Sequence, residues 1–187
     1  MSDDRLHFTG NDEADRLLVD EPLALLVGFV LDQQVPLQKA FSGPLELKRR
    51  LGSLRAGEIA AMDPARLDAV FRERPALHRF PGNMAKRTQE LCAVISGDYG
   101  GDAARVWTEA RDAADLERRL HDLPGFGDMK VRTLAAVLVK RLGVRPPGWE
   151  AIVPGHMSLG DVDSPARLAE YQAAKRAHKA AMREAKS

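Results

Sequence analysis

The sequence predicts an all-α fold. Hydrophobic residues recur at spacings of three and four along most of the chain, and no stretch of useful length alternates between apolar and polar residues as a half-buried strand would. The chain has 187 residues, of which 44% are hydrophobic and 29% charged, which is enough apolar material for one sizeable core. We therefore expect residues 1–187 to form a single helical domain, with a core at about 15–170 and a basic tail at about 172–187.

Six helices are expected in the first half of the chain. The first surrounds Leu17 and Leu18. Asp20 offers a cap for the second, which begins at Pro22, ends at Leu31 and is apolar on nearly every side, as expected for a helix in the centre of a domain. The others are expected at 37–51, 59–62, 64–71 and 86–95, with Gly43-Pro44 as a point where the helix at 37–51 could be split and His78-Arg79-Phe80-Pro81-Gly82 as a turn-rich connection.

The clearest local pattern is a pair of amphipathic helices joined by a glycine-containing turn. The first of them stops before Pro124-Gly125-Phe126-Gly127, which cannot continue a helix. The second keeps its apolar residues at helical spacing over 131–142. The segment Val144–Gly160 is rich in proline and glycine and is expected to hold no long element. Asp163-Ser164-Pro165 then has the chemistry of a cap and a first-turn proline, and it opens a final basic helix.

Cysteine content and hydropathy exclude several kinds of protein. Cys92 is the one cysteine, so the chain can form no internal disulfide, four-cysteine zinc site or iron–sulfur cluster of its own, and on an apolar helix it is expected to be buried. The longest apolar run, Leu23–Leu31, is about half of a membrane span, and the first 22 residues are acidic rather than leader-like. His78, His121 and His156 do not have a metal-binding spacing. We expect a cytoplasmic protein without a membrane partner or a protein-held metal.

Charged residues are unevenly distributed, although the formal net charge is only +1. Residues 1–22 carry a net charge of −5, whereas residues 123–145 and the last sixteen residues carry +4 each. If the fold gathers the two basic segments on one face, that face can bind a polyanion. The alternative is that both segments are ordinary solvated helix faces.

The turn between the two amphipathic helices has the chemistry to contact a phosphate. Gly125 and Gly127 have no Cβ atom, so a phosphate can approach the backbone closely. The first amides of the following helix point toward such a phosphate, and the helix dipole favours negative charge there. Lys130 and Arg132 are near enough in sequence to add positive charge. The alternative is an ordinary tight turn between two helices.

Two motifs in the chain resemble segments of a known family. Leu123-Pro124-Gly125-Phe126-Gly127-Asp128-Met129-Lys130 resembles the hairpin of helix-hairpin-helix DNA glycosylases, the HhH-GPD superfamily of base-excision repair. Leu31-Asp32-Gln33-Gln34-Val35-Pro36 resembles the Leu-x-Gln-Gln segment that these enzymes place against the damaged duplex. Together with Gly82–Leu91, His78-Arg79-Phe80-Pro81 and Gly148-Trp149, they resemble a small bacterial branch that lacks the iron–sulfur cluster. The likeness covers about residues 15–145 and implies the glycosylase fold, a monomer, and duplex DNA with a damaged or abasic site as the partner.

The resemblance implies a monofunctional DNA glycosylase. Such an enzyme cleaves the N-glycosidic bond through a cation-like sugar, so a carboxylate must lie beside that sugar. The family's aspartate follows the hairpin by about two dozen residues; Glu150 is nearest to that point, Asp161 is next, and Asp163 is explained as a helix cap. Strand-cleaving members carry their Schiff-base lysine where this chain has Met129. Lys130, rotated about 100° around the helix, is expected to point elsewhere, so no lyase step is expected.

Further contacts with DNA follow from the same segments. Gln33 and Gln34 carry amides that can probe base edges or fill the gap left by an extruded nucleotide, or else cap a buried helix end. Trp149 and Phe80 can stack on a base, or else anchor the packing. No cofactor is expected, although the resemblance allows a monovalent or divalent ion between hairpin carbonyls and a phosphate. The residues expected to bind DNA are Gln33, Gln34, Gly125, Phe126, Gly127, Met129, Lys130 and Arg132.

The sequence leaves three functions open. The first is base excision with Glu150 or Asp161 as the catalytic carboxylate. The second is a non-catalytic relative that binds abasic or distorted DNA, which the absence of the family's aspartate favours. The third is a helical interaction module outside nucleic acids, in which the hairpin only turns the chain; weak salt dependence of any DNA binding would indicate it, because phosphate contacts release counterions.

Overall fold

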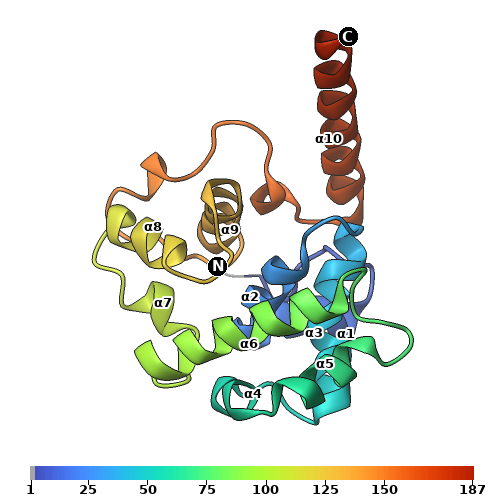
Figure 1. Cartoon of the computed structure of the whole chain (residues 1–187). Coiled ribbons are helices and arrows are strands. Elements are labelled where there is room, and N and C mark those ends of the chain that lie inside the picture. The colour runs from blue at the N-terminus through green and yellow to red at the C-terminus, as the bar shows by residue number, and fades with distance from the viewer. Residues whose placement is uncertain (1–2) are drawn as a thin grey trace.

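The computed structural model describes residues 3–187, and over this range the chain is helical and has no strand, which confirms the predicted all-α class. Its elements are α1 (Asp12–Asp20), α2 (Pro22–Leu31), α3 (Leu37–Leu51), α4 (Ala56–Ala61), α5 (Pro64–Arg72), α6 (Pro81–Asp98), α7 (Arg105–Thr108), α8 (Ala113–His121), α9 (Asp128–Lys140), the 3-10 helices η1 (Trp149–Ala151) and η2 (Leu159–Asp161), and α10 (Pro165–Lys186). Figure 1 shows one group of helices formed by α1–α6, a second formed by α7–α9, and α10 projecting away from both.

Helix α2 is the centre of the core, as its sequence predicts. Pro22 occupies the first turn, and every residue after it up to Leu31 is buried. Gly28 allows α3 to approach closely, because a Cβ atom at this position would lie 2.5 Å from the Phe41 ring. Phe41 also packs edge-on against Phe29, with ring centroids 5.1 Å apart. The loop that follows α2 is therefore attached to a helix that is packed on all sides.

Several helix boundaries differ from the prediction, including the cap of α2, the start of α4 and both ends of α6, whereas α3 has its predicted bounds. The N-cap position of α2 is Glu21 rather than Asp20, and the Glu21 side chain makes no capping hydrogen bond. Helix α3 continues through Gly43-Pro44, because both residues are buried and Leu31 fills the space where a glycine Cβ would be, at 2.4 Å. Helix α6 begins at Pro81, so the connection before it is shorter than expected; a proline in the first turn lacks only an amide that would have no helical partner.

The predicted pair of amphipathic helices is present as α8 and α9. The apolar face of α9 is buried between Val131 and Val139, and η2 packs against it. Gly160 permits that contact, because a Cβ atom there would lie 2.5 Å from the carbonyl oxygen of Ala136. As predicted, the segment 144–160 holds only short 3-10 turns.

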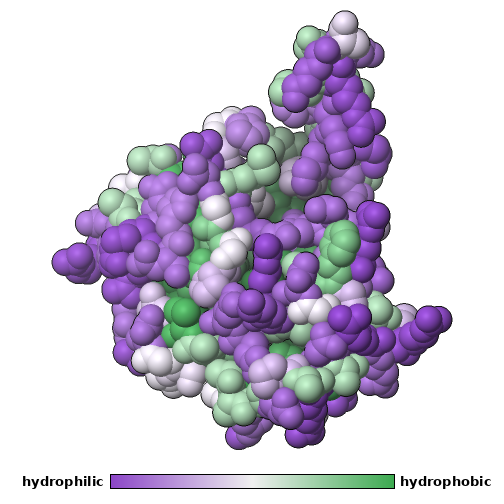
Figure 2. Space-filling view, in the orientation of Figure 1, coloured by the Kyte–Doolittle hydropathy of each residue, from purple (hydrophilic) through white to green (hydrophobic). Residues whose placement is uncertain are grey.

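Helix α10 begins as predicted but is mostly unpacked. The Ser164 hydroxyl accepts a hydrogen bond from the Arg167 amide at 3.2 Å, so the cap is Ser164 and not Asp163. Leu168 is the one buried residue of this helix. Figure 2 shows that its projecting part is covered mainly by hydrophilic side chains. Within residues 3–187, no helix is both long enough and apolar enough to span a membrane.

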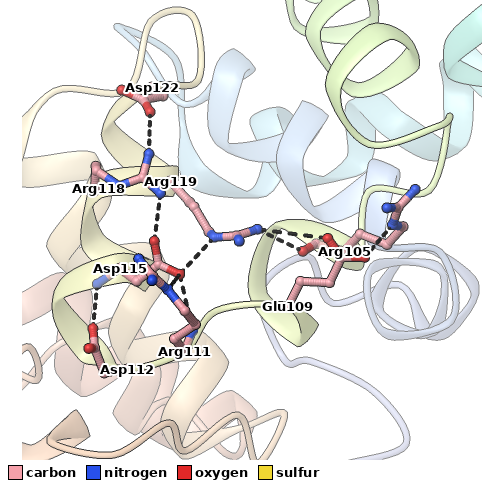
Figure 3. Close-up of polar contacts among 8 residues, drawn as sticks. All are labelled: Arg105, Glu109, Arg111, Asp112, Asp115, Arg118, Arg119 and Asp122. Carbon is pink, nitrogen blue, oxygen red and sulfur yellow. Dashed lines mark hydrogen bonds and ion pairs between the residues drawn. The ribbon is translucent and has the colours of Figure 1, made fainter.

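Asp115, a buried residue of α8, organises a cluster of charged side chains (Figure 3). Its side chain is only 4% exposed. It accepts hydrogen bonds from the Arg111 backbone amide at 3.1 Å, from Arg118 at 2.6 Å and from Arg119 at 3.1 Å. The hydrogen bond from the Arg111 amide, followed by that from Arg118, holds the pKa of this carboxyl well below its usual range in spite of burial.

Candidate nucleic-acid interface

An open cavity of about 900 Å³ lies where the loop after α2, the turn before α9 and one side of α10 come together. These three segments are far apart in the sequence. They include the Gln-Gln motif, the glycine turn and the basic tail. The lining residues are Phe29, Asp32, Gln33, Gln34, Val35, Pro36, Arg79, Gly125, Gly127, Asp128, Met129, Lys130, Thr133, Tyr171, Lys175 and Lys179.

His78 fixes the loop at residues 32–36 from behind. Its Nε2 atom lies 3.0 Å from the Leu31 carbonyl oxygen and 2.9 Å from the Gln33 carbonyl oxygen, and its Nδ1 atom accepts a hydrogen bond from the Phe80 amide at 2.9 Å. These partners assign the proton to Nε2 and leave the ring neutral. Burial also lowers the pKa of His78, which favours the neutral form. His78 therefore has a structural role and holds the loop that forms one wall of the cavity.

The two glutamines of the loop are held differently. The Gln33 side chain accepts a hydrogen bond from Arg87 at 2.9 Å, so part of its amide is already used within the protein. Gln34 is exposed and has a φ of 55°, which is the left-handed region that residues other than glycine rarely adopt. Backbone strain of this kind is concentrated at functional sites. Both residues line the cavity, and Gln34 is the one with a free amide at its surface.

The glycine turn presents open backbone to the cavity. Gly125 has a φ of 81°, and no atom lies within 4 Å of a Cβ built on Gly125 or Gly127. Gly127 is the N-cap of α9, whose first amides receive no side-chain cap there. Phe126 is 4% exposed and packs inward, so it shapes the turn and offers no surface for a ligand. The exposed carboxylate of Asp128 lies in the first turn of α9, where it competes with any incoming anion.

Lys130 turns its amine into the cavity wall. The Nζ atom is buried, has no hydrogen-bond partner within the described chain, and lies 5.7 Å from the centroid of the Phe126 ring. Burial lowers the pKa of Lys130 to about 8, and the nearby Asp32 carboxylate opposes this shift. Met129 is 83% exposed at the same cavity. Lys130 was expected to point away from the Schiff-base position, which Met129 occupies, and to bind DNA; both residues line the cavity.

Asp32 is a cavity residue that the sequence analysis did not select. It is the C-cap of α2 and is half-buried, and within residues 3–187 no group donates a hydrogen bond to its carboxylate. Burial raises the pKa of Asp32, and the positive charges of Lys175 and Lys130 oppose the shift. The available signal in the sequence was its position: it is the first charged residue after a wholly apolar helix, inside the Leu-x-Gln-Gln motif.

The cavity gathers basic side chains from both segments that carry excess positive charge. Lys130 comes from the hairpin segment, and Lys175 and Lys179 come from α10; Arg79 adds a fourth cation that the sequence analysis did not select. The Lys175 amine also lies 5.6 Å from the centroid of the Tyr171 ring. A cavity with four cationic groups and two carboxylates can bind an anionic ligand.

Several predicted site residues lie outside this lining. Glu150 is exposed on η1. Asp161 accepts hydrogen bonds from Lys140 at 2.6 Å and from the Ser158 amide at 2.8 Å, and these bonds lower its pKa against the effect of burial. Asp161 therefore stabilises the connection to α10 through a capping box on η2.

The remaining predicted residues have local partners. Arg145 lies over the half-buried Trp149 ring at 5.3 Å, on the segment that contains Glu150. Phe80 is 38% exposed, next to the cavity residue Arg79, whose guanidinium lies 5.3 Å from its ring centroid. Arg132 is exposed on α9 outside the lining. Of the two aromatic residues expected to stack on a base, Phe80 is thus the one beside a cavity-lining residue.

No group of three or more histidine, cysteine, aspartate or glutamate side chains is arranged to hold a metal in the part of the chain that the structure describes. Cys92 is buried in α6, and burial raises its pKa to about 12, so it is a thiol packed in the core as predicted. The chain matches no protein-family model, no curated protein and no solved structure.

Proposed function

We propose that this protein binds duplex DNA at an abasic or distorted site. The observation that carries the proposal is the convergence of the glycine turn, the exposed Gln34 and the cations of α10 around one open cavity. In this proposal the backbone amides at the start of α9 contact a phosphate. Gln34 fills or probes the gap in the base stack, and the cavity accepts the displaced nucleotide.

The physical properties of the cavity suit such a ligand. Its volume of about 900 Å³ lies within the range of roughly 300–1,000 Å³ that is usual for ligand sites. Lysine and arginine side chains neutralise phosphates and release their counterions. The likeness of its two main segments to the hairpin and the Leu-x-Gln-Gln segment of DNA glycosylases supports the same assignment.

Base release is the second candidate function. Neither Glu150 nor Asp161 lines the cavity, so the carboxylates selected by the resemblance give no support to catalysis there. The specific observation in favour of a monofunctional glycosylase is a different carboxylate, Asp32, which does line the cavity.

A binding comparison tests the proposal. We expect tighter binding to a duplex with one tetrahydrofuran abasic analogue than to the same duplex with a normal base, by at least about tenfold at one fixed salt concentration. Gly127→Asp adds a carboxylate where the phosphate would lie and should weaken binding by about tenfold or more. Because aspartate is a favoured N-cap and Gly127 has a φ of −85°, this variant should fold normally.

Gly155→Asp is the matched control, because Gly155 also has open space around it but lies outside the cavity. It should bind like the unmodified protein. Equal affinity for the normal and the abasic duplex, or equal loss in the two glycine variants, would contradict the proposal.

A further inference from the structure

Two carboxylates line the cavity, and only one of them is partly withdrawn from water. The Asp128 side chain is 87% exposed and lies 3.6 Å from His121. Asp32 is half-buried at the base of the loop, next to the glutamines. A carboxylate that interacts strongly with a ligand needs to be partly removed from solvent, because charge interactions are weakened in water. Asp32 meets this condition and Asp128 does not.

Most other buried or half-buried carboxylates in the described chain have hydrogen-bond donors, whereas Asp32 and Glu117 do not; Glu117 lies on α8, outside the cavity. Asp15 accepts three hydrogen bonds from Phe8 and Thr9, the longest of them 3.1 Å. Asp161 is bonded to Lys140 at 2.6 Å. An ionised carboxylate that is withdrawn from water without hydrogen-bond donors destabilises the folded state. An apolar or neutral residue would be more stable at this position, so the carboxylate suggests contact with a ligand. The geometry at Asp32 is therefore suited to a ligand that supplies positive charge or a hydrogen-bond donor.

The surroundings of Asp32 also favour a positive ligand centre at this point. Asp32 caps the C-terminus of α2, where the carbonyl end of the helix carries partial negative charge. Lys130 and Lys175 lie near enough to favour the ionised form of the carboxylate. The Nζ atom of Lys130 is itself buried, so of these two groups the Asp32 carboxylate is the one left to contact a ligand.

On the basis of the proposed function, we propose that Asp32 is the catalytic carboxylate of this cavity and that it contacts the sugar of the displaced nucleotide. The N-glycosidic bond breaks with its electron pair leaving on the base, and positive charge develops at C1′ next to Asp32. Water adds to C1′ and transfers one proton to the Asp32 carboxylate. That proton then passes to the departed base, so the products are the free base and an abasic sugar with a hydroxyl group at C1′. No cofactor or further reactant is consumed.

Two abasic analogues test this assignment without knowledge of the damaged base. One duplex carries neutral tetrahydrofuran, and the other carries a cationic pyrrolidine at the same position. A transition-state mimic binds about 100-fold or more tightly than a substrate at an intact catalytic site, so the unmodified protein should prefer the pyrrolidine duplex by about that factor. Asp32→Asn should lose this preference and keep its affinity for the tetrahydrofuran duplex within about threefold.

Asp128→Asn is the matched electrostatic control, since it removes one negative charge from the same cavity. It should change both affinities in the same direction and leave their ratio intact. If Asp128→Asn lowers the ratio as much as Asp32→Asn does, the preference is general electrostatics and the assignment of Asp32 is wrong. If Glu150→Gln removes the preference while Asp32→Asn keeps it, the catalytic carboxylate is Glu150.

Failure of the inference and failure of the proposed function give different results. Equally tight binding of both analogues by the unmodified protein would leave abasic-site binding standing and overturn the catalytic role of Asp32. No preference for either analogue over a normal duplex would overturn the proposed function itself. Strand cleavage without alkali, together with a borohydride-trapped complex that Lys130→Met abolishes, would assign the chemistry to the Lys130 amine instead of Asp32.

Discussion

Asp115 and Asp32 are both aspartates withdrawn from water, but the protein treats them in opposite ways. Asp115 accepts hydrogen bonds from one backbone amide and two arginines, and its pKa is held below its usual range (Figure 3). Asp32 receives no hydrogen bond from any described residue, and burial raises its pKa. The Asp115 carboxylate has its hydrogen-bond partners within the fold, whereas the Asp32 carboxylate is available to a ligand.

This difference separates a structural charge from a candidate functional one. A buried charge with all its partners in place stabilises the local fold, and removing it leaves the partners unsatisfied. A buried charge without partners is a cost to the folded state. Stability measurements should therefore move in opposite directions at the two sites, even though the substitution is the same.

Asp115→Asn should have the largest effect. The variant weakens the bonds to Arg118 and Arg119 and should lower Tm by roughly 5–10 °C at pH 7. Because the folded-state pKa of Asp115 is depressed, its contribution is present above the unfolded value of 3.8 and is lost as the pH falls through the folded value. The Tm difference from the unmodified protein should thus be present at neutral pH and shrink in strong acid.

The control for Asp115 is Asp122→Asn. Asp122 pairs with the same arginine, Arg118, at 3.2 Å, but its side chain is 65% exposed. Exposed pairs contribute little, so Tm should stay within about 2 °C of the unmodified protein. Equal Tm for both variants would contradict the structural role of Asp115.

Lys130→Met should stabilise the protein, in contrast to Asp115→Asn. The pKa of Lys130 is lowered to about 8 from 10.5, so charging this amine costs more in the folded state than in the unfolded state. The cost is fully present below pH 8 and disappears by about pH 10.5. We expect a gain of about 1–2 kcal/mol in the free energy of unfolding at pH 7, after allowing for solvent screening.

Urea unfolding at pH 7 and pH 9.5 would measure this gain, which should be smaller at the higher pH. The control is Lys86→Met, since Lys86 is exposed and does not line the cavity. A loss of stability in Lys130→Met at pH 7 would show that the amine has a partner within the fold. Lys130 would then be a structural charge like Asp115, and only Asp32 would remain as an unpartnered charge of the cavity.

The cations of α10 should affect DNA binding without affecting stability. Each phosphate contact contributes about 0.9 to the slope of log affinity against log salt concentration, so Lys175→Gln/Lys179→Gln should reduce the slope by about 2. The control Arg55→Gln/Arg66→Gln removes two exposed charges outside the cavity. An unchanged slope in the α10 variant would place the duplex elsewhere on the molecule.

The helices could be predicted from the sequence because their spacing is local. The apolar runs predict α2 and α9, and Ser164 followed by Pro165 predicts where α10 begins. The arginines around Asp115 are likewise visible as i, i+3 and i+4 neighbours. Helix α3 has its predicted bounds, but the sequence left open a break at Gly43-Pro44, because burial of that turn in the core is what outweighs the local cost of proline.

The cavity was only partly predictable because it is made by tertiary packing. The motifs around Gln34 and Gly127 were visible as motifs, and the structure brings them together. Glu150 was selected by counting along the chain from the hairpin, but the chain there turns through η1 at the surface. Nothing local indicates that Asp32 lacks donors, since this depends on where α9 and α10 pack.

Asp32→Asn should give a smaller change in stability than Asp115→Asn or Lys130→Met, and the sign of the change is what matters. A folded-state pKa above the ordinary 3.8 means that the protonated form is favoured by folding, so the stability that this group contributes is present below pH 3.8 and lost as the pH rises through the folded value. At pH 7 the ionised side chain is therefore a cost. Replacing it with the neutral amide should raise the free energy of unfolding by no more than about 1 kcal/mol. This gain should vanish in acid, where both side chains are neutral.

Urea unfolding of the variant and the unmodified protein at pH 7 and pH 3.5 measures both values. A variant that is less stable at pH 7 would mean that the Asp32 carboxylate has partners within the fold, and Asp32 would then belong with Asp115 as a structural charge.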